Sequence, residues 1–140
     1  MSRLDRALLA EKTATVERHL TRIVQRLPQD LEEFHPMTDA SDAVILHLWQ
    51  AVQIVLDLAG SACLHLHLGT PQSYGESFRR LSEAGFLEPG LAARLARAAG
   101  FRNVIAHAYE TIDMERVYRV AREGPADLRA FLAALQEHIQ

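Results

Sequence analysis

Apolar residues recur at intervals of three and four along almost the whole chain, and this spacing constrains the fold more than any other feature of the sequence. Side chains at these intervals share one face of an α-helix. The strict alternation that would place apolar residues on one face of a strand is sustained nowhere. The sequence therefore predicts an all-α fold, in which amphipathic helices bury their apolar faces against one another.

Residues that cap or interrupt helices divide the chain into about five or six of them. A linker over about 28–39 separates the first helix from a long second one, for which Thr38 or Asp39 is the expected cap. Asp113 is the expected cap of the fifth helix, and the pair 124–125, Gly-Pro, divides that helix from a sixth. The expected helices cover about residues 5–27, 40–68, 73–84, 90–109, 113–123 and 126–139.

The ends of the short third helix carry specific signals. Ser73 and Glu76 have the spacing of a capping box, in which each side chain satisfies a free backbone amide of the other. Gly85 is expected to end this helix, and Gly69 with Pro71 to end the long helix before it. The chain of 140 residues thus predicts one domain, 1–140, folded as an antiparallel helical bundle.

Composition narrows the class of protein. The net charge of −3 argues against a generic nucleic-acid binder with a basic surface, although a local basic groove is compatible with it. Cys63 is the single cysteine, so no intrachain disulfide forms, as expected in a reducing cytoplasm. The N-terminal stretch lacks the apolar run of a signal peptide, and the apolar stretch 43–68 contains too many polar residues for a lipid-facing helix. We therefore expect a soluble cytoplasmic protein that does not bind a membrane.

An arginine lies on the apolar face of the fourth helix. Arg102 must face a carboxylate, a ligand phosphate, a water-filled groove or another subunit, unless it forms a buried ion pair or extends to solvent along the apolar surface. Tyr109 shares this face and by itself suggests a core or interface residue. The positions that form the face are Leu91, Leu95, Ala98, Arg102, Ile105 and Tyr109.

His107 does not share that face. Because each residue turns a helix by about 100°, Arg102 and His107 lie about 140° apart around the axis. If Arg102 and His107 act in the same site, either the helix loosens or ends near 106–107, or two copies of the chain complete the site. A single histidine near a helix end is more often structural than catalytic, so both interpretations of His107 remain open at this point.

The stretch "FRNVIAHAYETID" resembles the Arg-x4-His-x-Tyr motif of HEPN-domain proteins, and it is most similar to their HepT subgroup. The stretch "PQSYGESFRRLSEAGFL", the long helix with "VQIVLDLA" and the C-terminal tail follow in the order of that subgroup. The likeness extends over roughly residues 40–138. It implies a homodimeric, metal-independent endoribonuclease without a cofactor, which is the toxin of a toxin–antitoxin pair and cleaves transfer RNA or messenger RNA.

The resemblance assigns roles that agree with the chemistry of the residues. Arg102 would bind the phosphate and stabilise the charge of the transition state, and His107 would transfer protons. Asn103 would help to position the substrate. Asp57, on a polar stripe of the second helix with His47, Gln50 and Ser61, would orient an active-site arginine or histidine. The alternative for Asp57 is a hydrogen bond at the edge of the core.

Tyr109 has a second implied role. In the HepT subgroup a minimal nucleotidyltransferase antitoxin transfers AMP to the motif tyrosine, and the added anions would exclude an RNA phosphate. Two other functions stay open: a non-catalytic HEPN module that binds nucleotides or scaffolds a nucleotidyltransferase, and a helical interaction protein whose motif is structural.

Overall fold

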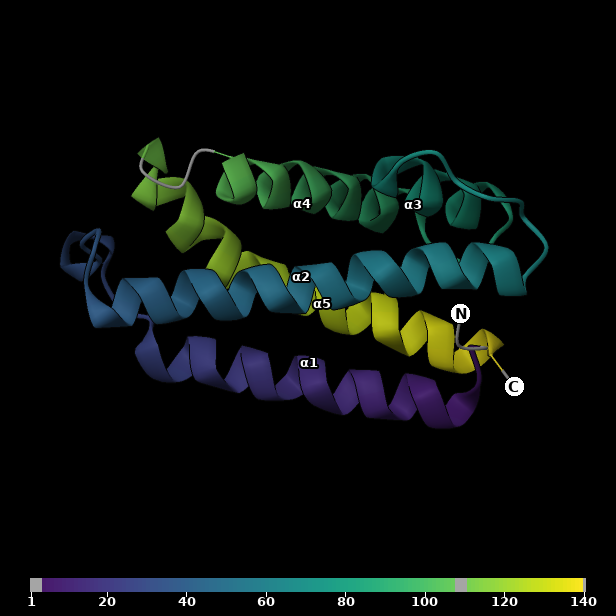
Figure 1. Cartoon of the computed structure of the whole chain (residues 1–140), viewed down its shortest axis with the longest axis horizontal. Coiled ribbons are helices and arrows are strands. Elements are labelled where there is room, and N and C mark those ends of the chain that lie inside the picture. The colour runs from purple at the N-terminus through teal and green to yellow at the C-terminus, as the bar shows by residue number, and fades with distance from the viewer. Residues whose placement is uncertain (1–3, 108–110, 140) are drawn as a thin grey trace.

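The computed structural model describes residues 4–107 and 111–139, and it is all-helical over these residues, which confirms the predicted fold class. Helices α1 and α4 run opposite to α2 and α5 (Figure 1). The helices are α1 (Arg6–Arg26), a short 3-10 helix (Leu31–Glu33), α2 (Asp39–His65), α3 (Tyr74–Glu83), α4 (Pro89–His107) and α5 (Met114–His138).

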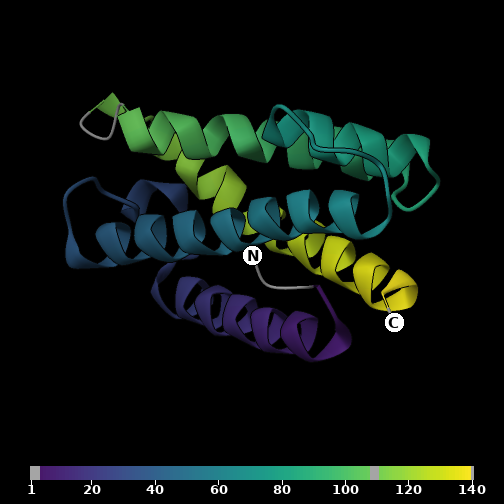
Figure 2. The ribbon, with the colours of Figure 1, turned by 45° about the vertical axis from the view of Figure 1, so that its right-hand side comes forward.

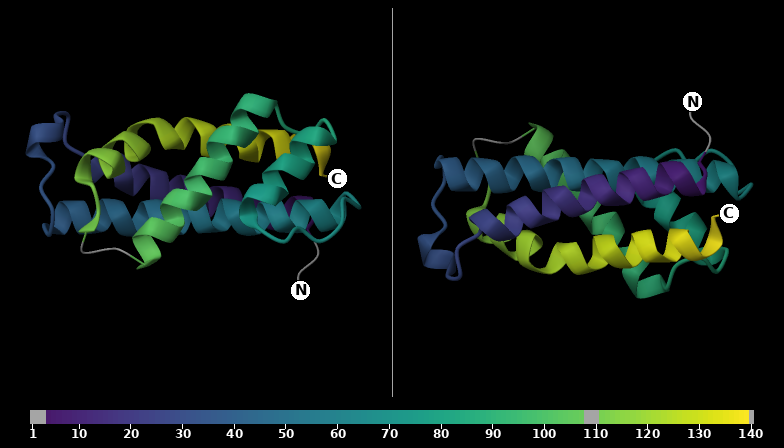
Figure 3. Two further views of the ribbon diagram at one scale, coloured as in Figure 1. Left: turned by 90° about the horizontal axis from the view of Figure 1, so that it is seen from above. Right: turned by 90° about the horizontal axis from the view of Figure 1, so that it is seen from below.

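The central element is α2, which packs against each of the other four α-helices. Helix α1 lies on one side of it, and α3 and α4 lie on the other (Figures 1 and 2). Seen from above, α4 runs obliquely across α2 and α5 (Figure 3). The start of α2, the end of α4 and the start of α5 lie at the same end of the bundle, so the fold brings the motif helix close to two other helix ends there.

The central position of α2 explains its composition. By length and composition alone, α2 is apolar enough to cross a membrane. In the bundle, 50% of its most apolar stretch is buried, and the helix contacts neighbours on several sides. We therefore interpret α2 as the core helix of the bundle.

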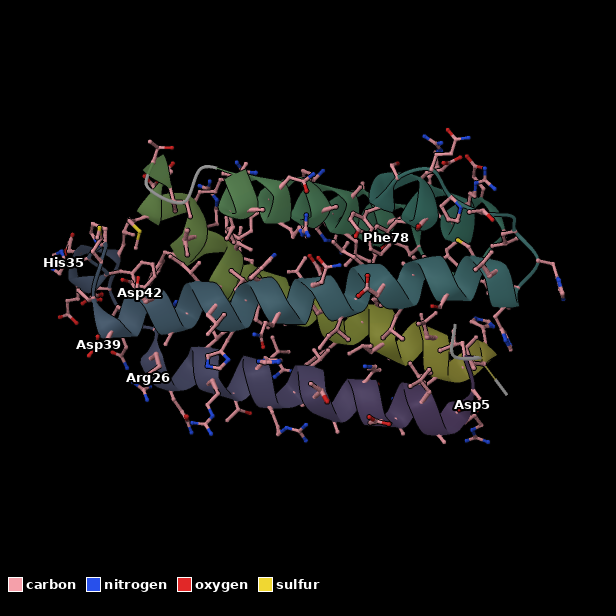
Figure 4. The ribbon with its side chains drawn as sticks, in the orientation of Figure 1. Asp5, Arg26, His35, Asp39, Asp42 and Phe78 are labelled. Atoms are coloured by element: carbon pink, nitrogen blue, oxygen red, sulfur yellow. The ribbon has the colours of Figure 1, made fainter. Side chains whose placement is uncertain are left out.

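Aromatic side chains join α3 to α5 in the core. Phe78 points from α3 into the bundle (Figure 4) and is fully buried. Its ring meets the edge of Phe131 from α5, with 5.6 Å between ring centroids. Cys63 is also buried and free, and burial raises the pKa of its thiol. This thiol is therefore part of the packed core.

The predicted helix starts are largely confirmed. Thr38 caps α2 and forms a reciprocal capping box with Ser41, and the Asp113 carboxylate accepts hydrogen bonds at the start of α5. At α3, the Ser73 hydroxyl accepts from the backbone N–H of Glu76 at 3.1 Å, as predicted. The reciprocal bond was predicted to come from the backbone N–H of Ser73, and this prediction is wrong. The Glu76 carboxylate accepts instead from the backbone N–H of Gln72 at 2.6 Å.

Two helix ends show how the chain turns. Gly85 has a φ of 88° and follows α3, where the N–H of Phe86 donates to the Leu81 carbonyl, as in a Schellman motif. Helix α2 ends at His65, three residues earlier than predicted from Gly69. The reason is that His67 itself adopts a φ of 59°, the left-handed conformation in which a glycine is usually found.

The predicted break at Gly124–Pro125 is wrong, since α5 continues through both residues. Proline removes one backbone hydrogen bond and costs a helix interior roughly 3 kcal/mol. Pro125 is itself buried, and buried apolar residues lie on both sides of it. Because burial of each large apolar side chain contributes about 1.5–3 kcal/mol, a continuous helix is favoured. The buried residues of this stripe are Val117, Ala121, Leu128, Phe131, Leu132 and Leu135.

Candidate functional site

The motif is carried by α4, whose start is held by a side chain outside the helix. The Glu88 carboxylate accepts hydrogen bonds from the backbone N–H groups of Gly90 at 3.1 Å and Leu91 at 3.3 Å. This satisfies amides that have no partner within the helix. Helix α4 then continues in α conformation to His107, so the backbone of the motif is well defined up to that residue.

Arg102 lies in the contact between α4 and α2 and is half-buried. Its Nε donates to the side-chain oxygen of Gln53 on α2 at 2.8 Å, and its Nη1 donates to the side-chain oxygen of Asn103 at 3.1 Å. Within residues 4–107 and 111–139, it makes no ion pair with a carboxylate. The guanidinium is thus held in place by neutral groups, and its positive charge is not compensated by a described neighbour.

Gln53 connects Arg102 to two further polar residues. Its side-chain NH2 donates to the Asp57 carboxylate at 2.9 Å and to the Tyr74 hydroxyl at 3.3 Å. Asp57 therefore reaches Arg102 through Gln53, and no direct bond between Asp57 and Arg102 is present among the described residues. Because the two bonds orient the amide, they also fix which end of Gln53 faces the arginine.

Gln53 and Tyr74 were not among the site residues predicted from the sequence. Gln53 lies one helical turn before Asp57, and this spacing places both on one face of α2. This spacing is visible in the sequence, but it does not by itself mark a functional residue. Tyr74 lies at the start of α3, in the stretch similar to the HepT subgroup. Its contact with Gln53 depends on the packing of α3 against α2, which periodicity alone does not give.

The other two motif residues are only partly covered by the structure. The backbone of His107 lies in α4, and the regular helix keeps positions 102 and 107 about 140° apart around the axis. The sequence placed a loosening or the end of the helix near 106–107, and α4 is regular up to His107, its last described residue. Tyr109 lies outside the described residues. A site that uses both Arg102 and His107 therefore requires a substrate that reaches around α4, or a second copy of the chain.

The face of α2 that carries Gln53 and Asp57 also exposes two leucines. Leu46 is 46% exposed and Leu64 is 39% exposed. The helical positions 46, 53, 57 and 64 lie within about 40° of one another around the axis. Exposed leucines thus flank the polar network on one surface, which we call the α2 face.

Two hollows adjoin the α2 face. One, of about 340 Å³, lies between the start of α2 and the end of α4, at the end of the bundle where Figure 4 labels Asp42. Trp49 lines it together with Ile105 and Ala106. The other, of about 490 Å³, lies between α2 and the start of α3, and both Asp57 and Ser61 line it. The predicted polar stripe of α2 therefore faces a groove over this part of its length.

His47, which was predicted to belong to the same stripe, turns to α1 instead. Its Nδ1 lies 3.0 Å from Nδ1 of His19 on α1. Burial is the largest cause that lowers the pKa of each ring in this histidine pair, and the pKa of His19 is further lowered by His47. Over residues 4–107 and 111–139, no group of three or more His, Cys, Asp or Glu side chains could hold a metal ion.

Comparison with known proteins gives consistent results. The mRNA nuclease HepT of Shewanella oneidensis is 27% identical over 129 residues, which cover 92% of this chain and 96% of that protein. A crystal structure of a toxin–antitoxin with AMP-PNP matches with a TM-score of 0.86 and 26% identity, covering 95% of this chain and 100% of the matched chain.

A second structure is the tri-AMPylated HEPN toxin of Shewanella oneidensis in complex with its MNT antitoxin. It has a TM-score of 0.83 and 27% identity, over 93% of this chain and 97% of that one. The family model described as ribonuclease HepT-like matches residues 16–135. That range contains α2 to α4 and most of α5, together with the network around Arg102. The chain belongs to the HepT-like ribonuclease family.

Proposed function

We propose that this protein is the toxin of a toxin–antitoxin pair and acts in the cytoplasm as a metal-independent endoribonuclease. Family membership supports the ribonuclease activity, and the relatives described above are an mRNA nuclease and toxins in complex with an antitoxin. The substrate is RNA, either messenger RNA or transfer RNA. The inference about the site itself rests on one structural observation.

That observation is the state of Arg102. An arginine that served only to stabilise the fold would be expected to face a carboxylate, because a buried or half-buried charge without compensation is costly. Here the guanidinium is oriented by Gln53 and Asn103 and has no described carboxylate partner. Its remaining N–H groups have no partner among the described residues, and they could bind a phosphate with two parallel hydrogen bonds.

The chemistry follows from the substrate. The 2′-hydroxyl of RNA loses its proton to a base and attacks the adjacent phosphorus, and the bond from phosphorus to the 5′-oxygen breaks. The departing 5′-oxygen takes up a proton, which leaves a 2′,3′-cyclic phosphate and a 5′-hydroxyl. His107 is the proposed proton-transfer group, since imidazole titrates near neutral pH. Arg102 stabilises the negative charge that grows on the phosphate oxygens.

A homodimer would bring two copies of the motif together. The motif supplies one histidine in each chain, which is too few for two proton transfers, and positions 102 and 107 diverge around α4. The exposed leucines of the α2 face surround the Arg102 network and suit a two-fold contact between copies. We place the dimer interface on this face, so that Arg102 of each copy lines one cleft.

Tyr109 is the proposed site of control. A nucleotidyltransferase antitoxin would transfer AMP from ATP to its hydroxyl, which forms a phosphodiester bond and releases pyrophosphate. Each added AMP brings an anion and a bulky base beside the phosphate site. Both effects oppose RNA binding. This control is separable from catalysis, because the tyrosine hydroxyl takes no part in the cleavage step above.

The test is induced expression of wild type, Arg102→Ala and His107→Ala, with cell growth, RNA integrity and protein solubility measured together. We expect wild type to arrest growth and degrade RNA, and both variants to remain soluble without either effect. RNA degradation that persists in the soluble variants would overturn the site assignment. A wild-type protein that binds nucleotides but degrades no RNA would instead indicate a non-catalytic module.

A further arm tests the modification. When wild type and antitoxin are produced together, mass spectrometry should detect AMP on wild type and none on Tyr109→Phe. The phenylalanine variant should keep its RNase activity and escape neutralisation. Neutralisation of wild type without any added mass would show that the antitoxin acts by binding alone.

A further inference from the structure

A cleft on the other flank of α4 gathers four arginines from two helices. It lies between α4 and α5 with α2 as its floor, and its volume is about 280 Å³. Helices α4 and α5 diverge toward the end of the bundle that carries the motif (Figure 3). Arg94 and Arg97 line the cleft from α4, and Arg116 and Arg119 line it from α5. We call this the α4–α5 cleft.

Most of this positive charge is uncompensated. Arg94 forms an ion pair with Asp127 at 3.1 Å, at the part of the cleft farther along α5. Arg97, Arg116 and Arg119 form no ion pair within the described residues. Glu123 is the one other acidic residue in the lining. In a chain with a net charge of −3, the concentration of unpaired arginines in one hollow favours an anionic ligand.

The lining is also suited to the apolar part of a nucleotide. Apolar side chains also line the cleft, among them Val52 from α2 and Leu95 and Phe101 from α4. Phe101 is 2% exposed, and the guanidinium of Arg116 lies over its ring, 5.5 Å from the centroid. A guanidinium is planar and offers a surface on which a base can stack. The cleft therefore combines a stacking surface with groups that bind phosphate.

The cleft is close to Arg102. Phe101 is the preceding residue in the chain, and Arg97 lies about 7.5 Å from Arg102 along the helix axis. Arg102 itself faces α2, on the other flank of the same helix. A short stretch of single-stranded RNA that crosses α4 would therefore connect the phosphate at Arg102 with the cleft.

We propose that the α4–α5 cleft is a second RNA-binding subsite, which holds a nucleotide flanking the scissile phosphate and its own phosphate group. This inference rests on the proposed function, because it assumes that RNA is the substrate. The subsite increases affinity for longer RNA, and it takes no part in the cleavage chemistry. Arg97 and Arg119 are its phosphate-binding residues, and Arg116 is its stacking residue.

The test compares the double variant Arg97→Ala/Arg119→Ala with a matched control, Arg22→Ala/Arg26→Ala, which removes two exposed arginines from α1. Binding of a fluorescent single-stranded 12-nucleotide RNA is measured in a His107→Ala background at several salt concentrations. We expect the cleft variant to lose about tenfold or more in affinity, while the control keeps the affinity of the parent. The slope of log K against log salt should fall by about 1.4, which is about 0.7 for each lost phosphate contact.

Cleavage assays separate binding from chemistry. With intact His107, the cleft variant should cleave a dinucleotide at the wild-type rate but show a raised KM for the 12-nucleotide RNA. An unchanged affinity and salt slope would overturn the subsite, and so would an equal loss on the dinucleotide and the longer RNA. Normal RNA binding combined with loss of antitoxin binding would also overturn it, since the cleft would then bind an acidic protein surface.

These results distinguish the subsite from the proposed function. If wild type cleaves RNA and the cleft variant binds RNA like its parent, only the subsite fails. If wild type cleaves no RNA but binding still depends on Arg97 and Arg119, the proposed function fails, and the cleft is an RNA-binding site that serves no cleavage reaction.

Discussion

Removal of the Gln53 side chain should impair RNA cleavage without unfolding the protein. Gln53 is the one group on α2 that is hydrogen-bonded to Arg102 in the described structure, through a bond of 2.8 Å. A hydrogen bond to a charged group contributes about 1.5–3 kcal/mol. Because both side chains are half-buried, we take the lower end, about 1.5 kcal/mol, which corresponds to roughly a tenfold loss in kcat/KM.

The assay follows cleavage of a fluorescent RNA by purified Gln53→Ala, with thermal unfolding of each variant measured alongside. Gln50→Ala is the matched control, since Gln50 is exposed on the same helix. Gln53→Glu gives a second test, because it introduces a negative charge. A carboxylate at this position would pair with Arg102, so RNA binding should weaken beyond the effect of the alanine variant.

The two outcomes are easily told apart. We expect Gln53→Ala to stay folded at the assay temperature, although the lost hydrogen bonds lower its unfolding temperature by a few degrees, and to lose kcat more than it changes KM for a dinucleotide. If Gln53→Ala cleaves RNA as fast as Gln50→Ala, the orientation of Arg102 by Gln53 does not matter for catalysis. A loss of activity that tracks a lower unfolding temperature would make Gln53 a structural residue only.

Three further predictions concern the fold and the assembly. Gly85→Ala should lower the free energy of unfolding by about 1–2 kcal/mol, because Gly85 has a φ of 88°. Gly100→Ala should raise it by about 0.5–1 kcal/mol, because Gly100 lies inside a helix and has open space around its Cβ position. Urea titrations measure both changes. The histidine pair has lowered pKa values in the folded state, so its contribution to stability is complete above about pH 6.5 and declines as the pH falls below that value. Urea titrations at several pH values should show this decline in the free energy of unfolding. The decline should be smaller in His47→Gln. Leu64→Glu on the α2 face should shift the protein toward monomer in analytical ultracentrifugation, whereas Val24→Glu, which changes an exposed apolar residue on α1, should not. If the Leu64→Glu protein sediments like wild type, the α2 face is not the dimer interface.

Periodicity and capping residues predicted much of this fold. The three-and-four spacing indicated helices, and Thr38, Asp113 and Gly85 marked helix ends correctly. These signals are local, because a cap acts on amides within its own turn. The errors arose where packing outweighs a local signal. The buried stripe of α5 continues past Pro125, and His67 adopts the left-handed conformation although a glycine follows two residues later.

The site was predictable in part. The position of Arg102 on an apolar helix face marked it as unusual, and the motif spacing suggested its neighbours. The partner that orients it, Gln53, lies far away in the sequence and reaches it only because α4 packs against α2. The same holds for Tyr74 and for the four arginines of the α4–α5 cleft. Contacts between helices depend on how the helices are arranged in space, which helix periodicity does not specify.

In the proposed mechanism, Arg102 and His107 cleave RNA by activating its own 2′-hydroxyl, without a metal ion. The most direct measurement is the chemistry of the RNA ends that purified wild type and Arg102→Ala produce in the presence of a chelator. Wild type is predicted to leave 2′,3′-cyclic phosphate and 5′-hydroxyl ends, and the folded Arg102→Ala protein is predicted to leave the RNA intact. Cleavage that stops on chelation, cleavage that yields 5′-phosphate ends, or undiminished cleavage by Arg102→Ala would contradict the claim.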